Sequence, residues 1–344
     1  MKILVRGTNW VGDAVMTIPA LRELRRIFPN AEITLYTRSW ARGIFQDAEF
    51  LDEILVFDKT KSKIKDAFSQ SNLLKNRTYD LAVLLPNSFE SALIVKMAFI
   101  SQRFGYAKEG RGFLLTGAIE IPVWKNLRHE VFYYLNLIAE IEKSFFKTQT
   151  VLQNEPRFDL AVSAQRRAEA RKILEENGID LTRKIVALGV GSTNSRAKRW
   201  QTKGYAELND LLQTELNANV VLVGAKDETD VSTEVYEKSK RKPYVLTGKT
   251  NLAEIVAILS EIDLLVSNDM GLAHIAPAVG TKTLVIFGPT NEKTTRPFPE
   301  IAEIVRKTVE CSPCMLRDCP IDHRCMTRIS PQEVFERAAI ILNH

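Results

Sequence analysis

Short apolar runs alternate with longer amphipathic segments along most of this chain, which is the pattern of a parallel sheet with helices on its faces. Runs typical of buried strands in the first third are Lys2–Arg6, Glu32–Thr37, Glu53–Phe57 and Tyr79–Leu85. Helical or partly helical spacing follows three of them, at Ala14–Ile27, Ser39–Gln46 and Lys61–Lys75. A helix at Ser88–Ile100 and a strand at Arg103–Ala107 continue the alternation, so we predict a Rossmann-like domain.

The alternation stops after the apolar segment His129–Lys143 and then begins again. Residues 144–158 are polar and lack periodicity, so we predict that they link two domains, 1–158 and 159–330. Predicted helices of the second domain are Ser163–Asn177, Thr202–Leu216, Glu228–Lys240 and Leu252–Ser260, and predicted strands are Ile185–Val190, Val220–Val223 and Tyr244–Leu246. Two Rossmann-like domains in tandem predict the α/β arrangement called GT-B, in which two parallel sheets face each other across a cleft.

A last helix is indicated at the C-terminus. Ser330-Pro331-Gln332-Glu333 has the order of a capping box with proline at the first helical position, and the helix should run through Leu342. We expect this segment, 331–344, to pack back on the N-terminal domain.

Composition and charge narrow the class of protein. The 344 residues suffice for two domains, and the apolar share of 45% and charged share of 26% are those of a globular protein. A net charge of +5 is compatible with an anionic substrate or a membrane surface and requires neither, and we expect no nucleic-acid partner. The start of the chain shows strand patterning rather than a signal peptide, and no apolar run approaches membrane-spanning length. We therefore expect a cytoplasmic protein.

The pattern of the stretch Leu264–Thr290 predicts a strand, a polar turn, a helix and a second strand. Its turn, with Asp269, Met270 and Gly271, opens a helix at Leu272–Val279, and free N–H groups at such a helix end bind anions. His274 lies on the first turn of that helix. A histidine satisfied within a helix–sheet interface is the ordinary alternative, but next to an anion site we interpret His274 as a ligand contact.

The loop Gly191–Trp200 follows the predicted strand Ile185–Val190 and is the second candidate for an anion site. It combines small and hydroxyl-bearing residues with amides and cations, the groups that a phosphate-binding loop needs. The alternative is a solvated basic loop. Its position opposite the turn Asp269–His274 favours the phosphate site, so the two segments should flank one diphosphate.

The loop Gly7–Asp13 follows the first strand and lacks the GxGxxG spacing of a dinucleotide site, so no NAD or FAD cofactor is expected there. Asp13 fits two interpretations equally well: a helix N-cap, or a general base that takes the proton of an attacking hydroxyl. Downstream, Asp227 and Glu228 follow another strand, and we favour a capping role for them over ribose contacts. No Asp-x-Asp pair for a divalent cation occurs in the sequence.

Two motifs, KILVRGTNWVGDAVMTIPALRELRRIFP near the start and SNDMGLAHIAPAVGTKTLVIFGPT near the end, resemble the ADP-heptose:lipopolysaccharide heptosyltransferases of glycosyltransferase family 9. TNWVGD, AKRW at Ala197–Trp200 and the cysteine-bearing tail are most similar to heptosyltransferase II. The resemblance spans essentially the whole chain. It implies a GT-B fold, ADP-heptose as donor, a lipid A-Kdo-heptose acceptor, inversion at the anomeric carbon and no metal. Heptosyltransferases I and III, and a non-catalytic nucleotide-binding module, are the alternatives.

The resemblance also implies roles for single residues. Asp13 matches the proposed catalytic base and Lys198 the lysine that contacts the donor diphosphate. The other residues that match donor-binding positions are Ser192, Thr193, Asn194, Thr250, Asp269, Met270, Gly271 and His274. Asn194 stands where the family has a hydroxyl residue, and Met270 replaces a more usual small residue but keeps its backbone N–H.

Four cysteines and one histidine are concentrated near the C-terminus: Cys311, Cys314, Cys319, Cys325 and His323. The number of ligands would suit zinc, but the spacing departs from paired CxxC motifs, and we predict reduced thiols without metal. Measuring zinc per chain after purification without chelator would test this.

Lysines and apolar residues in the first domain suggest a lipid surface. Lys59, Lys61, Lys63 and Lys65 lie within one segment, and Arg103, Lys108 and Arg111 precede the apolar residues 113–115. Peripheral contact with an anionic inner membrane is one interpretation, because each nearby cation contributes about 1 kcal/mol. A solvated charged face is the other.

Overall fold

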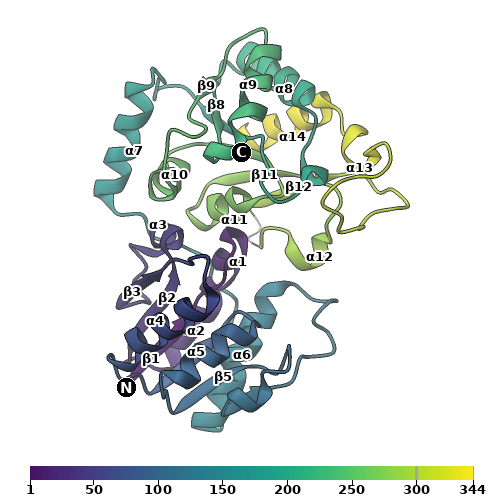
Figure 1. Ribbon diagram of the computed structural model, residues 1–344. Coiled ribbons are helices and arrows are strands. Elements are labelled where there is room, and N and C mark those ends of the chain that lie inside the picture. The colour runs from purple at the N-terminus through teal and green to yellow at the C-terminus, as the bar shows by residue number, and fades with distance from the viewer. Residues whose placement is uncertain (299–300, 344) are drawn as a thin grey trace. The chain divides into compact units, whose positions relative to one another are not determined.

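The computed structural model describes residues 1–298 and 301–343, and its internal contacts divide the chain into an N-terminal unit, Met1–Phe158, and a C-terminal unit, Asp159–His344. The N-terminal unit contains one parallel sheet in the order β3-β2-β1-β4-β5-β6 (Figure 1). Its strands are β1 (Lys2–Arg6), β2 (Glu32–Arg38), β3 (Glu53–Phe57), β4 (Leu81–Leu84), β5 (Gln102–Tyr106) and β6 (Gly117–Ile119). The order changes direction at β1, which is where open α/β sheets bind ligands beyond their carboxyl ends.

Helices cover the sheet of the N-terminal unit. They are α1 (Val11–Met16), α2 (Ile18–Ile27), α3 (Arg42–Phe45), α4 (Lys63–Lys75), α5 (Phe89–Met97) and α6 (Glu130–Phe146). α4 packs beside α5 and α2 beside α6. Leu4, Ala82 and Leu84 from the strands and Ile94 and Val95 from α5 belong to one buried apolar cluster.

The helix predicted at Ala14–Ile27 is two helices. α1 begins earlier, at Val11, and gives way to α2 at Thr17. Pro19 stands in the first turn of α2, and because proline has no N–H and clashes with the preceding turn, one continuous helix is disfavoured there. Trp10, not Asp13, is the N-cap of α1, so the capping interpretation of Asp13 is wrong.

The C-terminal unit contains a second parallel sheet in the order β12-β11-β10-β7-β8-β9. Its strands are β7 (Ile185–Gly189), β8 (Asn219–Val223), β9 (Tyr244–Val245), β10 (Leu264–Asn268), β11 (Lys282–Phe287) and β12 (Ala302–Arg306). The helices are α7 (Ala164–Glu176), α8 (Thr202–Glu215), α9 (Thr229–Lys238), α10 (Leu252–Leu259), α11 (Gly271–Ala278), α12 (Glu292–Thr295), α13 (Arg324–Thr327) and α14 (Pro331–Asn343). β6 and β12 were not predicted, because both are edge strands without a continuous apolar run.

The C-terminal helix α14 belongs to the C-terminal unit. It packs on α8, β10 and β11, and Val334, Ala338 and Ile341 join the buried cluster of that unit. Ser330 Oγ accepts a hydrogen bond from the Glu333 N–H, as the capping box predicted. The structure thus assigns α14 to the C-terminal unit, and a contact of segment 331–344 with the N-terminal domain stays a prediction.

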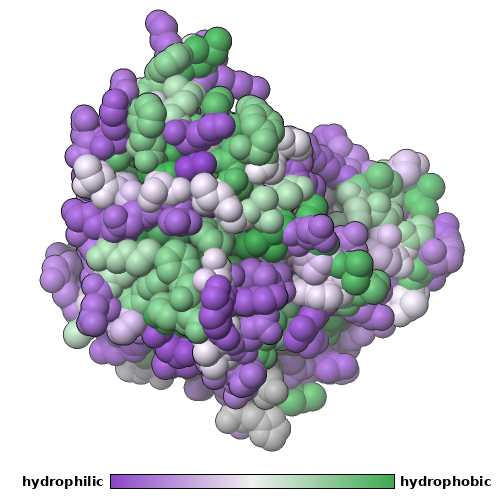
Figure 2. All heavy atoms as spheres, turned by 90° about the horizontal axis from the view of Figure 1, so that it is seen from below, coloured by the Kyte–Doolittle hydropathy of each residue, from purple (hydrophilic) through white to green (hydrophobic). Residues whose placement is uncertain are grey.

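Most apolar side chains of both units lie in these cores, yet the surface is mixed. Figure 2 shows one face on which hydrophobic side chains are exposed in patches between hydrophilic ones. Among the described residues, no helix is long and apolar enough to cross a bilayer.

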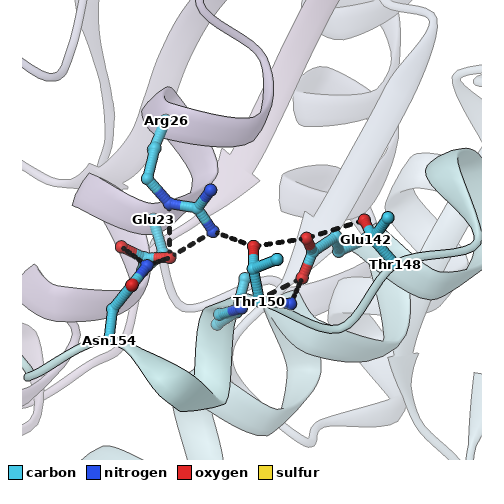
Figure 3. A network of polar contacts seen from close by, with 7 residues as sticks. Glu23, Arg26, Glu142, Thr148, Thr150 and Asn154 are labelled. Carbon is cyan, nitrogen blue, oxygen red and sulfur yellow. Dashed lines mark hydrogen bonds and ion pairs between the residues drawn. The ribbon is translucent and has the colours of Figure 1, made fainter.

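The segment predicted as a linker, 144–158, is packed onto the N-terminal unit (Figure 3). Glu142 of α6 is buried and accepts hydrogen bonds from the backbone N–H groups of Thr150 and Val151 and from the hydroxyls of Thr148 and Thr150. Arg26 of α2 donates to Thr150 Oγ1 at 2.7 Å. Burial raises the pKa of Glu142, but these hydrogen bonds outweigh it and hold the pKa below its ordinary value. The segment is thereby fixed to α2 and α6.

Candidate active site

Asn268, the last residue of β10, joins two loops at the carboxyl edge of the C-terminal sheet. Its side chain is fully buried, and its Nδ2 donates to the carbonyls of Val190 and Gly191, each at 2.9 Å. Its Oδ1 accepts from the Trp200 N–H at 2.9 Å and from the Tyr205 hydroxyl at 3.0 Å. One amide thus fixes both ends of the loop Gly191–Trp200. The sequence pattern did not single out Asn268, although its position directly before Asp269 was an available signal.

Lys198 and Asp269 form an ion pair in which Nζ lies 2.8 Å from Oδ2. The Asp269 side chain is 4% exposed and the Lys198 side chain 26%, so the carboxylate is buried while the ammonium reaches solvent. Thr290 Oγ1, after β11, donates to the same Oδ2 at 2.7 Å. The two segments predicted to flank one diphosphate are therefore in direct contact, and Thr290 is an additional member that holds the carboxylate in place.

The tip of the loop Gly191–Trp200 is open. Ser192 is buried and its carbonyl accepts two hydrogen bonds from Arg199, whereas Thr193 and Asn194 are exposed. Thr193 Oγ1 lies 3.5 Å from Glu228 Oε1. The loop therefore presents one hydroxyl, one amide and the Lys198 ammonium from a backbone that is fixed underneath.

Residues 309–329 form hydrogen bonds to the loop Gly191–Trp200. Arg317 O accepts from the Ala197 N–H at 2.9 Å, His323 Nε2 lies 2.6 Å from Ala197 O, and Ile329 O accepts from the Trp200 indole at 3.1 Å. The tail that carries the cysteines thus positions Lys198. Its four cysteines are free thiols, and among the described residues no three His, Cys, Asp or Glu side chains form a group suited to a metal ion. The expectation of no metal stays a prediction.

Helix α11 begins beside the ion pair. Met270 is its N-cap in an extended conformation, and Gly271 is its first residue. Because the first N–H groups of a helix lack intrahelical acceptors, this end can receive an anion next to Lys198. His274 is buried, at 7% exposure, on the first turn of the same helix.

Glu228 lies deeper at the same sheet edge and is 1% exposed. Its Oε2 accepts from the Ala225 N–H at 2.9 Å, which matches the capping role predicted for it. A Cβ on Gly191 would approach its carboxyl group to 2.1 Å, so glycine is required there. Burial raises the pKa of Glu228. Thr250 lies in the turn after β9, next to Asn251, which caps α10.

The family model described as glycosyltransferase family 9 (heptosyltransferase) matches residues 68–324. The chain belongs to glycosyltransferase family 9. It is similar to lipooligosaccharide heptosyltransferase 2 of Campylobacter jejuni, with 28% identity over 100% of this chain and 99% of the relative. Lipopolysaccharide heptosyltransferase 2 of Escherichia coli K12 is also 28% identical and is matched over 99% of both chains.

Solved structures agree with this assignment. The structure of E. coli ADP-heptose lipopolysaccharide heptosyltransferase II matches with a TM-score of 0.86 and 27% identity, over 100% of this chain and 99% of that one. A family 9 glycosyltransferase from Veillonella parvula matches with a TM-score of 0.84 and 20% identity, over 99% and 97%. The GT-B fold prediction is confirmed, and the chain is a glycosyltransferase.

Asp13 of this glycosyltransferase is in the N-terminal unit, whereas the residues described above are in the C-terminal unit. It occupies the first turn of α1, beyond the carboxyl end of β1, and is half-buried. Its charge raises the pKa of the buried Tyr134 of α6, although burial is the larger cause of that shift. The carboxylate therefore lies beyond the carboxyl end of β1, and its role as the base stays a prediction.

Two of the cations proposed to face a membrane have structural roles. Arg111 is fully buried and donates to the carbonyls of Tyr106, Pro86 and Ser88. Arg103 donates to the carbonyls of Ile100 and Leu114. The inclusion of Arg111 in a charged surface is therefore wrong, whereas Arg103 is half-exposed and Lys59, Lys61, Lys63, Lys65 and Lys108 are exposed.

Proposed function

We propose that this glycosyltransferase transfers a heptose from ADP-heptose to the inner core of lipopolysaccharide, and that it adds the second heptose. The observation that carries the proposal is the Lys198–Asp269 pair at the N-terminus of α11, in a chain that matches heptosyltransferases 2 over its whole length.

The C-terminal unit is proposed to bind the donor. The developing charge on the leaving diphosphate would meet the Lys198 ammonium, the first N–H groups of α11 and the exposed Thr193 and Asn194. Ser192, Thr250, Met270 and His274 are proposed to complete the contacts to the sugar nucleotide. Cations and N–H groups are sufficient for this task, so no divalent ion is required.

The N-terminal unit is proposed to bind the acceptor and to supply the base. In an inverting transfer, the acceptor hydroxyl oxygen attacks the anomeric carbon while the bond from that carbon to the diphosphate oxygen breaks, and ADP leaves with the bonding electrons. Asp13 would take the hydroxyl proton as the new bond forms. Its place beyond β1 supports this role.

An ADP-release assay with truncated acceptors tests the function. We expect turnover with an acceptor that ends in heptose on Kdo, and none with one that ends in Kdo. Rates should be equal with and without excess EDTA. Use of the Kdo-terminated acceptor would indicate heptosyltransferase I. Use of longer acceptors alone would indicate heptosyltransferase III. No turnover with any acceptor would indicate a non-catalytic module. Loss of activity in EDTA with rescue by magnesium would contradict a metal-independent transfer.

We also propose peripheral contact with the anionic cytoplasmic face of the inner membrane, because the acceptor is a lipid. Helix α4 supports this: it buries Asp66 and Gln70 but exposes Ile64 at 72% and Phe68 at 57%. Lysines 59–65 border these apolar side chains. Exposed apolar groups next to lysines suit an anionic bilayer surface.

Vesicle binding by the full chain tests the membrane contact. We expect binding to vesicles with phosphatidylglycerol, weakening as salt rises, and little binding to phosphatidylcholine alone. The variant Ile64→Ser/Phe68→Ser should bind several-fold less, whereas Ile340→Ser, an exposed position on α14, should bind like the parent. Equal binding by all three proteins, or none by the parent, would leave α4 as a solvated face.

A further inference from the structure

Arg6, the last residue of β1, is a buried cation without a hydrogen-bonded carboxylate among the described residues. It is 4% exposed, its guanidinium carbon lies 3.6 Å from the centre of the Phe57 ring, and its NH1 makes one long bond, 3.3 Å, to the Tyr36 carbonyl. Its Nε has no hydrogen-bond partner in the described part of the chain. Burial lowers the pKa of Arg6 to about 10, which reflects the cost of keeping the charge there.

A second cation stands beside it. Arg38 ends β2, lies 5.6 Å from the centre of the same Phe57 ring, and is close enough to Arg6 to contribute to the lowering of its pKa. The described residues offer Arg38 no ion pair. Glu90 is an acidic group whose charge raises the pKa of Arg6, but its Oε2 is paired with Lys59 at 2.6 Å. Its buried Oε1 has no hydrogen-bond partner among the described residues.

The location is the carboxyl edge of the N-terminal sheet. Arg6, Arg38 and Phe57 are the last residues of three neighbouring parallel strands. Two further buried polar atoms close to them in the chain, Thr8 Oγ1 and the Tyr36 hydroxyl, have no hydrogen-bond partner among the described residues. Buried polar groups in native proteins are almost always paired, so unpaired donors next to excess positive charge indicate a missing anion.

We propose that Arg6, with Arg38, binds an anionic group of the acceptor, a carboxylate or a phosphate carried by its sugars. The proposal rests on the proposed function for the identity of the acceptor, and it assigns the specificity for that anion to the N-terminal unit. The planar guanidinium of arginine suits both anions because it donates two parallel hydrogen bonds.

Replacing Arg6 separates this role from a structural one. We expect Arg6→Met to raise the KM for the acceptor about tenfold to a hundredfold, as for loss of a charge-assisted hydrogen bond, with the KM for ADP-heptose within twofold of the parent. The melting temperature should stay equal or rise, because an uncompensated buried charge is removed. Arg6→Lys should give a smaller rise in the KM for the acceptor. Arg38→Gln, at a more exposed position, should also raise the KM for the acceptor. Arg77→Gln, which breaks a pair with Glu53 at the other edge of the sheet, is the control without a kinetic effect.

Ligand protection tests the site without turnover. With ADP saturating, so that the C-terminal anion site is filled, inorganic phosphate or free Kdo should raise the melting temperature of the parent more than that of Arg6→Met. Protection of the parent by inorganic phosphate would indicate that the natural group is a phosphate, and protection by free Kdo would indicate a carboxylate. No difference between parent and variant with either anion would overturn the proposal. So would an acceptor KM within threefold of the parent, or a fall in melting temperature with both KM values raised. If no acceptor is used at all, the proposed function fails, and protection by phosphate still tests the site.

Discussion

Asp13→Asn is expected to lower turnover about a hundredfold to ten-thousandfold, because it removes the proton acceptor proposed for the attacking hydroxyl and keeps the shape of the side chain. Affinity for ADP-heptose should hardly change, since the donor contacts proposed above are all in the C-terminal unit. The rate of the parent should fall at acid pH as a carboxylate is protonated, and the variant should lack that loss. Steady-state kinetics at saturating substrates and calorimetry with ADP measure both effects.

A purely structural role for Asp13 predicts a different result. Trp10 occupies the N-cap position of α1, and one structural contribution of Asp13 is its favourable interaction with the helix dipole, typically about 0.3 to 1 kcal/mol. Asp230, in the first turn of α9, is a matched position, and Asp230→Asn should have the same small effect on stability with no effect on turnover. If Asp13→Asn kept more than about a tenth of parental turnover, the catalytic role would be abandoned.

Lys198→Ala should weaken ADP binding about tenfold to a hundredfold, because a charge-assisted contact is worth about 1.5 to 3 kcal/mol. The structure adds a second cause. Without Lys198, the Asp269 carboxylate, 4% exposed, keeps the uncharged donor Thr290 and would repel the diphosphate. Calorimetric titration with ADP measures the loss.

The second cause, repulsion by the unpaired Asp269 carboxylate, predicts that the effects of substituting Lys198 and Asp269 on ADP affinity are not additive. Asp269→Asn in the Lys198→Ala background should recover part of the lost affinity, since the repelling charge is gone. Lys203→Ala is the control, because Lys203 is an exposed lysine in the same unit that pairs with Glu207 one helical turn away. An unchanged dissociation constant for Lys198→Ala would contradict the proposed contact with the diphosphate.

Local patterns predicted much of this fold because the periods of strands and helices are determined by residues that are close in sequence. The alternation that indicated strands such as Lys2–Arg6 and Leu264–Ser267 is a consequence of burying parallel strands on both faces, and it held in both units. Where the pattern is weak it failed, at β6, at β12 and at the break between α1 and α2. The break between α1 and α2 could nevertheless have been predicted from Pro19.

Residue types likewise predicted which side chains would gather at the C-terminal sheet. Lys198 and Asp269 follow different strands of one parallel sheet, and the carboxyl ends of such strands meet at one edge, so their proximity could be expected. That they form an ion pair reinforced by Thr290 could not, because contact depends on strand order and side-chain direction.

The sequence by itself determined the two α/β units, the family and the residue types available for a sugar-nucleotide transfer. Only the tertiary structure decided which polar groups are buried and with whom they pair. Asn268 ties together loops 68 and 78 residues away from it in the chain, and Arg6 is buried against Phe57 with an unpaired Nε. The physical reason is that helix and strand periods arise from bonds between near neighbours, whereas the desolvation and pairing of a polar atom depend on groups that only packing brings close.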